Sequence, residues 1–345
     1  MAIKSFKCPS CGAGLSFKPE LNKFRCDYCL SEFSEAEISN LYKQEDIKEK
    51  SLVDQSHLAS YNCNSCGATV VTDDTTTSTF CYYCHNPVIL SDRLAGNFMP
   101  DKMIPFSINK EKAQQIFLDW VKDFKFVPKD FYSSSQLEKI TGIYLPYWWA
   151  DCQVDVDYLA TLNKEKIYRE RNTEFTEVST YEIVRKARVN INNVEHLAFN
   201  KIDENLLNGF APYAENKAIA FSMPYLSGFF AEQYNISQEE VLNKIEKEVK
   251  NNSKTLVIES VDDRKNLKEI SSQIDIKDTE INYTLLPAWI LTYNYANKTY
   301  VFAVNGQSGK SFGELPLDSK KVAMSSLVIF TVILTLMLLG GMWIW

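Results

Sequence analysis

The strongest constraint on the fold of this chain is a cysteine pattern that occurs twice near its N-terminus. The first copy begins CPSCGAG and ends RCDYC, and the second begins CNSCGAT and ends FCYYC, 55 residues further along. Both copies have the spacing C-x2-C-x14-C-x2-C. Because the whole spacing is repeated, and not only one Cys-x-x-Cys pair, the sequence predicts two similar modules.

The spacing is typical of a closed metal site. Each Cys-x-x-Cys can form a tight turn that points two sulfurs at one centre, and fourteen residues suffice for a strand pair that returns the second turn. Four thiolates about 2.3 Å from Zn²⁺ complete a tetrahedron and leave no position for water or substrate. We therefore predict two structural zinc ions, bound by eight cysteines: Cys8, Cys11, Cys26 and Cys29 in the first ribbon, and Cys63, Cys66, Cys81 and Cys84 in the second.

Other interpretations of the cysteines stay open at this point. They could be inert buried thiols or a redox pair, and a tetrahedral set of four sulfurs also suits iron. His85 follows Cys84 and could replace one ligand. Gly12 and Gly67 follow the second ligand of each copy, where a residue that tolerates positive φ lets the turn close.

The C-terminal segment 322–345 predicts a transmembrane helix. It holds 24 residues without a charge. A helix of that length spans about 36 Å, which exceeds a hydrocarbon core of about 30 Å. Lys320 and Lys321 precede the segment, and Trp343 and Trp345 end it. The positive-inside tendency therefore predicts a single-pass cell-membrane protein, with a cytoplasmic body and its C-terminus at the outer side.

The N-terminus and the cysteine content agree with that topology. The first residues, MAIKSFKCPSC, contain no apolar run, so we expect no signal peptide. The cytoplasm keeps thiols reduced, so metal binding is favoured over a disulfide framework for the nine cysteines.

Net charge separates the candidate partners. The chain carries a formal charge of −7, which disfavours nucleic acid because surfaces that bind phosphate are built from surplus Lys and Arg. The first ribbon is mildly basic and the second carries Asp73, Asp74 and Asp92 against Arg93. A nucleic-acid-binding zinc-ribbon protein therefore stays as an alternative.

Between the ribbons and the transmembrane segment, helical and strand-like patterns alternate. Apolar residues at helical spacing predict a helix in the segment that starts at Asn109, and the Ser237–Glu240 capping box predicts a second helix. QVDVDYLAT, from Gln153, has the period of a strand. Ser34 and Glu37 form a capping box that opens a charged helical linker. The predicted fold class is α+β, in five segments: zinc ribbon 1 at 1–34, the linker at 35–60, zinc ribbon 2 at 61–93, a cytoplasmic α+β domain at 98–318, and the transmembrane helix at 322–345.

A weaker repeat lies inside the α+β domain. Leu-Pro-x-Trp occurs at Leu145–Trp148 and again at Leu286–Trp289, and an alternating strand follows each copy. Since proline interrupts a central strand, we expect each copy to mark the beginning of a strand, with its tryptophan anchored in the core. The repeat predicts two related strand-rich halves.

Signatures of catalysis are missing from the sequence. Gly309-Lys310-Ser311 lacks the upstream glycine of a phosphate-binding loop, and there is no H-E-x-x-H, nucleophile elbow or dinucleotide fingerprint. Cys152 is interpreted as a small buried hydrophobe, and Asp155 and Asp157 as a solvated strand face. We predict no catalytic residues and no enzyme, although an unrecognised membrane-associated enzyme with a pocket between the two halves stays open.

Five blocks in a fixed order resemble a known bacterial family. They are the CPSCGA and CNSCGA turns, GIYLPYWWADC from Gly142, PYLSGFFAEQYNIS from Pro224, the segment from Pro287 to VNGQSGKSFGELP, and the closing apolar span. Together they resemble bacterial membrane-anchored double zinc-ribbon proteins, labelled TFIIB-type zinc ribbon-containing. The chain is similar to the zinc-ribbon member of phage-shock-protein-A and SPFH envelope-stress operons.

The resemblance implies an adaptor or scaffold at the cytoplasmic face. Its implied partners are a PspA-like protein, an SPFH or flotillin-like protein, or another small membrane protein, with the bilayer contacted through 322–345. The eight cysteines are the only site residues that it transfers to this chain. The sequence leaves an oligomer open, as well as a small ligand of the 98–318 domain.

Overall fold

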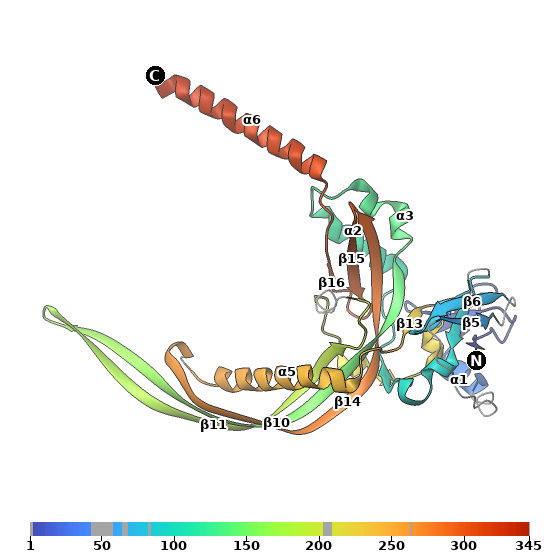
Figure 1. Cartoon of the computed structure of the whole chain (residues 1–345), viewed down its shortest axis with the longest axis horizontal. Coiled ribbons are helices and arrows are strands. Elements are labelled where there is room, and N and C mark those ends of the chain that lie inside the picture. The colour runs from blue at the N-terminus through green and yellow to red at the C-terminus, as the bar shows by residue number, and fades with distance from the viewer. Residues whose placement is uncertain are drawn as a thin grey trace.

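The computed structural model describes residues 3–42, 58–63, 68–81, 84–202, 209–262 and 264–344. Figure 1 shows the two ribbons packed beside the middle of a long, arched sheet. One end of the sheet leaves the body as a hairpin, and the C-terminal helix leaves from the other end. The chain is mixed α+β with strand-rich sheets, as its alternating patterns predict.

Two long antiparallel strands form the spine of the sheet. β10 (Thr141–Glu170) and β14 (Leu267–Tyr295) pair from Thr141 opposite Ile290 to Leu162 opposite Leu267. The alternation of QVDVDYLAT is realised here, because its apolar side chains are buried: Val154, Val156, Tyr158 and Ala160. β11 (Thr173–Leu197) flanks β10, and β15 (Lys298–Asn305) flanks β14, with β16 (Ser311–Gly313) on the outer side of β15.

The two predicted helices of this domain are confirmed. α2 (Lys110–Lys122) starts after Asn109, whose side chain accepts the Lys112 amide, and α5 (Gln238–Glu259) starts with the Ser237–Glu240 capping box. Each helix buries a stripe at helical spacing against the sheet: Ala113, Phe117 and Val121 in α2, and Val241, Ile245 and Val249 in α5. Leu242 of α5 is exposed, and so is Phe124, which lies two residues beyond the end of α2.

The proline prediction is wrong. Pro146 and Pro287 lie inside β10 and β14, not at their beginnings. Along one edge, β10 pairs with β13 (Phe230–Glu232) up to Tyr144 and with β11 from Tyr147 onward. β14 likewise exchanges β9 (Lys102–Met103) for β15 between Leu285 and Ala288. Each proline therefore occupies a gap in the ladder, where a missing N–H costs no hydrogen bond.

The ribbons are continuous with the main sheet. Within the described residues that sheet has 11 strands, in the order β1, β8, β7, β13, β10, β14, β15, β16, with β11 on β10 and β9 carrying β12 (Ile219–Ala220). β7 (Thr76–Phe80) and β8 (Pro87–Leu90) come from ribbon 2, and β1 (Ile3–Lys4) comes from the beginning of ribbon 1. The smaller sheets are β2 (Leu15–Lys18), β3 (Lys23–Cys26) and β4 (Glu32–Phe33) in ribbon 1, and β5 (Leu58–Asn62) with β6 (Thr69–Asp73) in ribbon 2.

The linker is helical only in part. α1 (Glu35–Tyr42) begins at the predicted capping box, in which the Ser34 amide donates to Glu37 Oε2 at 2.7 Å. Ile38 is fully buried, and the Tyr42 ring lies edge-on to Phe6 with centroids 5.0 Å apart, so this helix packs on ribbon 1. The helical prediction is wrong for residues 58–60, because they pair with β6 as part of β5. Residues 43–57 of the linker lie outside the described residues.

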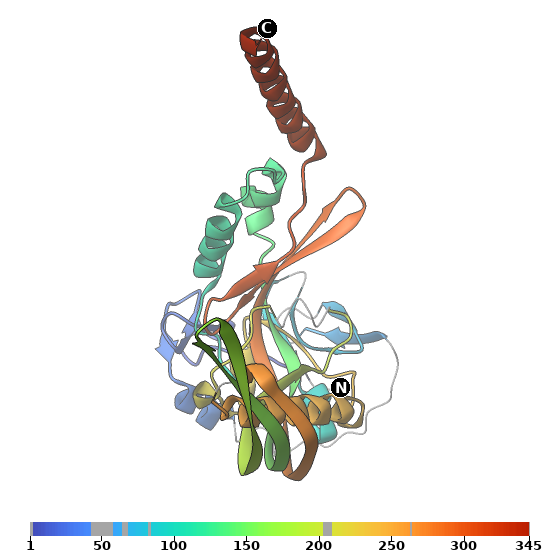
Figure 2. The ribbon, with the colours of Figure 1, turned by 90° about the vertical axis from the view of Figure 1, so that its left-hand side faces the viewer.

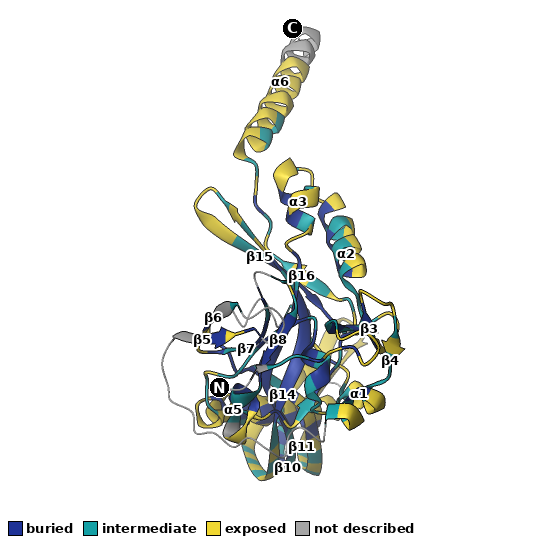
Figure 3. Cartoon of the chain, turned by 90° about the vertical axis from the view of Figure 1, so that its right-hand side faces the viewer, coloured by how far each residue is buried: buried dark blue, intermediate teal, exposed yellow. Residues whose placement is uncertain are grey.

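The C-terminal helix α6 (Ser319–Ile344) stands away from the body (Figure 2). Its segment Ser319–Met337 has a mean hydropathy of 1.7, and none of it is buried inside the protein. Figure 3 shows that its described side chains are mostly exposed. By length and composition α6 is a candidate membrane-spanning helix. The short α3 (Ser134–Leu137) lies near its root with α2.

Candidate metal centres

The four cysteines of ribbon 1 converge on one point. Their sulfur atoms all lie within 4.8 Å of one another. Cys8 Sγ is 3.5 Å from Cys29 Sγ, and Cys11 Sγ is 3.5 Å from Cys26 Sγ. Four sulfurs about 2.3 Å from a common ion stand about 3.8 Å apart, so the spacing fits a tetrahedral metal site. Cys8 and Cys26 are buried while Cys11 and Cys29 are exposed, so the site lies at the ribbon surface.

Matched backbone turns place these sulfurs. The Gly12 amide donates to the Cys8 carbonyl at 2.8 Å, and the Leu30 amide donates to the Cys26 carbonyl at 2.9 Å. Gly12 has φ +77°, as its position predicts. Leu30 also has a positive φ of 63°. The sequence offers no glycine there, and a leucine held in this conformation indicates that the turn, rather than the local preference of the residue, sets the backbone.

Hydrogen-bond donors stabilise the thiolate form of one exposed ligand. The Ser31 hydroxyl lies 3.2 Å from Cys29 Sγ. The Ser31 hydroxyl and its backbone amide lower the pKa of the Cys29 thiol to about 6. Since a metal binds the thiolate and not the thiol, these hydrogen bonds favour Cys29 as a ligand.

Ribbon 2 repeats the arrangement as far as it is described. Cys63, Cys81 and Cys84 bring their sulfurs within 4.8 Å of one another, and Cys63 Sγ is 3.7 Å from Cys84 Sγ. Its second turn closes as in ribbon 1, because the His85 amide donates to the Cys81 carbonyl at 2.9 Å. Cys66, the fourth predicted ligand, lies outside the described residues, as does Gly67.

His85 has a backbone role in this turn. It has φ +56° at the position that Leu30 occupies in ribbon 1. Its ring is not among the ligand atoms that come together in the described part of the cluster. The two described clusters can therefore hold a metal through cysteine alone.

One short segment of the body seats both ribbons. The Phe17 amide of ribbon 1 donates to the Ser227 carbonyl at 2.9 Å, and Ser227 Oγ donates back to the Leu15 carbonyl at 2.5 Å. Ser78 of ribbon 2 pairs with Ala231, and its hydroxyl donates to the Phe229 carbonyl at 2.8 Å. The segment 222–231 thus joins two ribbons that are far from it in sequence.

The rings at this seat add to its apolar contact. Tyr225 packs against Phe17 and Phe24 of ribbon 1, with ring centroids 4.8 and 5.4 Å apart. Gly228 has φ +101°, and a Cβ there would stand 3.1 Å from the Ser16 Cβ. The backbone of ribbon 1 comes close to the body at Gly228, where a residue without a Cβ fits.

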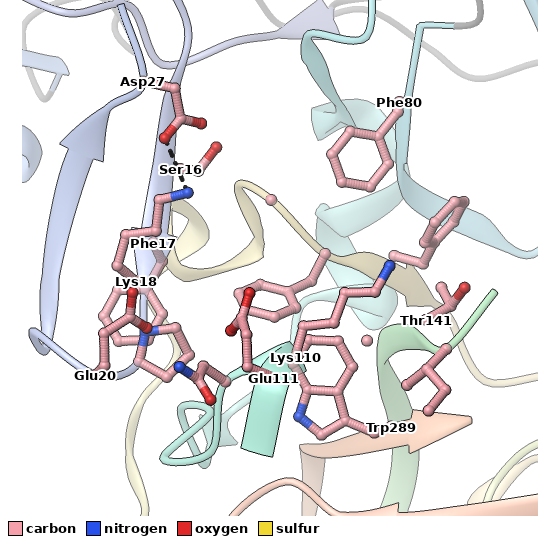
Figure 4. Close-up of a pocket in the computed structure, with 17 residues that line it drawn as sticks. Ser16, Phe17, Lys18, Glu20, Asp27, Phe80, Lys110, Glu111, Thr141 and Trp289 are labelled. Atoms are coloured by element: carbon pink, nitrogen blue, oxygen red, sulfur yellow. Dashed lines mark ion pairs between the residues drawn. The ribbon is translucent and has the colours of Figure 1, made fainter. Parts of the chain in front are cut away.

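A cavity of about 420 Å³ lies between ribbon 1 and the body. Figure 4 shows Phe80 and Trp289 on opposite sides of it, with charged side chains from ribbon 1 and α2 around it. Lys18 pairs with Asp27 at 3.0 Å, and Lys110 donates to the Glu138 carbonyl at 2.7 Å. Its described lining contains no cysteine or histidine.

The remaining polar candidates have structural surroundings. Burial raises the pKa of the Cys152 thiol, which is 3.7 Å from Thr279 Oγ1. Arg188 binds Asp155 through two hydrogen bonds of 2.8 and 3.1 Å on an exposed strand face. His196 Nε2 is 3.1 Å from Glu248 Oε2, on the sheet beneath α5.

Comparison with known proteins identifies a relative along nearly the whole chain. No family model matches, and no solved structure does. The uncharacterized protein YdjG of Bacillus subtilis (strain 168) is 30% identical over 326 residues. The match covers 93% of this chain and 92% of the relative.

Proposed function

This chain belongs to the family of the Bacillus subtilis protein YdjG, and from that premise and the geometry above we propose that it is a membrane-anchored zinc-ribbon adaptor. In this proposal Zn²⁺ occupies both cysteine clusters. α6 crosses the cell membrane once, with the body on the cytoplasmic side. The body then recruits a PspA-like or SPFH-type protein in an envelope-stress response.

The observation that carries the proposal is the combination of a closed four-thiol cluster in ribbon 1, with three converging thiols described in ribbon 2, and an exposed apolar helix. Four cysteines that complete a tetrahedron leave no coordination position for a substrate, so such a metal supports structure. The ribbons bury few apolar side chains of their own, and metal binding contributes roughly 10 to 16 kcal/mol to folding in comparable small modules. α6 buries none of its candidate span in the protein, and a bilayer supplies the missing apolar surroundings.

The hairpin at the far end of the sheet supports a role in binding another protein. β14 ends its pairing at Leu162, so beyond that residue β10 and β11 continue as two strands alone, to Glu170 opposite Thr173. We call residues 163–182 the arm. A two-stranded ribbon is marginally stable in water. Five large apolar side chains on or near the arm are at least 42% exposed: Ile167, Tyr168, Phe175, Val178 and Tyr181.

The partner class rests on the resemblance of the five sequence blocks to the family named above.

The arm presents an ordered aromatic surface. Tyr168 and Phe175 stack across its two strands with ring centroids 5.6 Å apart, and both rings remain exposed. Exposed aromatic side chains of this kind are typical anchors of protein interfaces. We therefore assign partner binding to the arm.

Affinity purification of crosslinked native membranes tests the proposal. The unaltered chain is expected to co-purify a PspA-like or SPFH-type protein. Replacing Tyr168→Ser together with Phe175→Ser should lower the recovery of that protein at equal levels of the adaptor. Tyr28→Ser, at an 83% exposed site on ribbon 1, is the matched control for loss of a surface aromatic residue. Recovery of no such protein with the unaltered chain contradicts the assignment.

A further inference from the structure

The first turn of α6 is fastened to the loop that follows α2. The Asp318 amide donates to the Phe126 carbonyl at 2.8 Å, and Lys321 Nζ donates to the Val127 carbonyl at 2.6 Å. The Asp318 carboxylate also accepts the amides of Lys320 and Lys321, at 3.1 and 3.3 Å. These bonds cap the helix and hold its beginning on the body.

This attachment fixes the depth of the loop when α6 crosses a bilayer. The uninterrupted apolar run begins at Val322, directly after Lys321. One helical turn advances about 5 Å, so the loop lies about that far from the edge of the hydrocarbon core. The interfacial layer on each side of that core is about 5 to 7 Å thick. Residues bonded to the first turn must therefore lie within the headgroup layer or directly against it.

The surface around the attachment has the composition expected at that depth. We call segments 123–132 and 317–321 the collar; Figure 2 shows the helices of this region beside the root of α6. Three of its large apolar side chains are exposed, by 37 to 61%: Phe124, Tyr132 and Leu317. Three of its lysines are exposed: Lys125, Lys129 and Lys320. Aromatic rings and lysines are enriched at the headgroup level of membrane proteins.

The collar also contains acidic residues. Asp123 and Asp130 are exposed, and Asp318 is engaged as the cap of α6. The four lysine and three aspartate side chains in its two segments leave a net charge of +1. A positive surface within the headgroup layer favours anionic over zwitterionic lipid, at about 1 kcal/mol for each lysine near the surface.

We propose that the collar binds anionic phospholipid headgroups on the side of the membrane that carries the body. Phe124 and Tyr132 lie in the interfacial layer, and Lys125 and Lys129 contact lipid phosphates. This contact fixes the tilt of the body against the bilayer and keeps the arm at a constant height above it. The inference depends on α6 crossing a bilayer, and it does not depend on the identity of the protein partner.

Photocrosslinking of the full chain in lipid nanodiscs tests the collar. Phe124 is replaced by photoreactive p-benzoylphenylalanine, and lipid adducts are measured by intact mass spectrometry. The same replacement at Phe330, 62% exposed within α6, marks a site in the hydrocarbon core. Replacement at Tyr28, 83% exposed on ribbon 1, marks a site away from the membrane.

We expect lipid adducts at positions 124 and 330 and background yield at 28. Adding phosphatidylglycerol to phosphatidylcholine discs should raise the yield at 124 several-fold, while K125E with K129E should remove that increase. K164E with K166E, on the arm, should leave the yield at 124 unchanged. Adducts at 330 with only background yield at 124 would overturn the collar while leaving the anchor intact.

Two other results separate the inference from the proposed adaptor function. Background yield at both 124 and 330 would show that α6 does not insert, and it would overturn the collar and the anchor together. Crosslinks from 124 to a protein in native membranes, without lipid adducts, would assign the collar to a protein partner and overturn the lipid assignment.

Discussion

Trp148 and Trp289 make the same contact in two places. Their indole N–H groups donate to the carbonyls of Ile236 and Ile108, each at 2.9 Å. Ile236 directly precedes the N-cap of α5, and Ile108 directly precedes the N-cap of α2. The two Leu-Pro-x-Trp copies therefore each hold the beginning of one helix against the sheet.

The equivalence extends to the surrounding strands. Leu145 and Leu286 are direct partners on the antiparallel strands β10 and β14. β13 runs parallel to β10 at Ile143 and Tyr144, and β9 runs parallel to β14 at the corresponding Thr284 and Leu285. The chain thus has a pseudo-two-fold arrangement about the Leu145–Leu286 pair, in which the short strand preceding each helix joins the long strand of the other half.

We expect Trp148→Phe and Trp289→Phe to destabilise the protein to a similar extent. Each change keeps an aromatic ring but removes the N–H that donates to the Ile236 or Ile108 carbonyl. Leaving that carbonyl without a donor costs about 1 to 2 kcal/mol of folding stability. Trp149→Phe is the matched control, because its indole donates to the Asn193 side chain, which can turn to another partner. Thermal unfolding of the full chain in detergent measures the three variants. Equal losses for all three would show that the two carbonyl contacts have no special role.

Parts of this architecture could be predicted from the sequence because they depend on short spacing. The cysteine intervals located the cluster of ribbon 1, the helical spacing of apolar residues after Asn109 located α2, and the capping box at Ser237 located α5. An additional alignment was visible but not used: FSIN from Phe106 corresponds to YNIS from Tyr234, and in both an aromatic residue and an isoleucine precede the N-cap.

Other parts depend on contacts between distant segments. The position of Pro146 within a central strand depends on β10 exchanging β13 for β11, and a local pattern contains no information on that exchange. The seating of both ribbons on 222–231 joins segments about 150 to 210 residues apart, in part through the backbone contacts Phe17–Ser227 and Ser78–Ala231, which any residue can make. Only Gly228, with its positive φ, marks that seat in the sequence.

Removing one ligand should remove one ion. We expect Cys8→Ser to lower the zinc content from two ions per chain to one, because three thiolates and a hydroxyl do not complete the site. Cys152→Ser is the control, because Cys152 lies in the main sheet and belongs to neither cluster. This variant should keep both ions. Elemental analysis of the purified full chain measures the ratio. Two ions bound by the Cys8 variant would contradict the ligand assignment.

The seat of ribbon 1 should be sensitive to a single methyl group. Gly228→Ala places a Cβ 3.1 Å from the Ser16 Cβ at φ +101°, so we expect a loss of about 1 to 3 kcal/mol and weaker docking of ribbon 1. Gly96→Ala is the matched control, because φ is +62° there but no atom lies within 4 Å of the added Cβ. Hydrogen exchange of residues 15–26 should increase in the first variant alone. Unchanged exchange in the Gly228 variant would argue against the seat.

Glu195 should make stability depend on pH near neutrality. Burial raises the pKa of its carboxyl to about 7, while its oxygen accepts the Tyr213 amide at 3.1 Å. The unfolded chain releases this proton near pH 4.5 and the folded chain near 7, so the folded state binds more protons between those values. Stability therefore falls as pH rises from about 4.5 to about 7, by about 1 to 3 kcal/mol.

Replacing this carboxyl by an amide isolates its effect. Glu195→Gln keeps an oxygen for the Tyr213 amide but cannot ionise. At pH 5 the variant should unfold close to the unaltered chain, because Glu195 is then protonated in the folded state. At pH 8 the variant should be more stable by about 1 to 3 kcal/mol, because it no longer buries a charge. Unfolding curves of both chains at the two pH values measure the difference, and a constant difference at both would refute the assigned pKa.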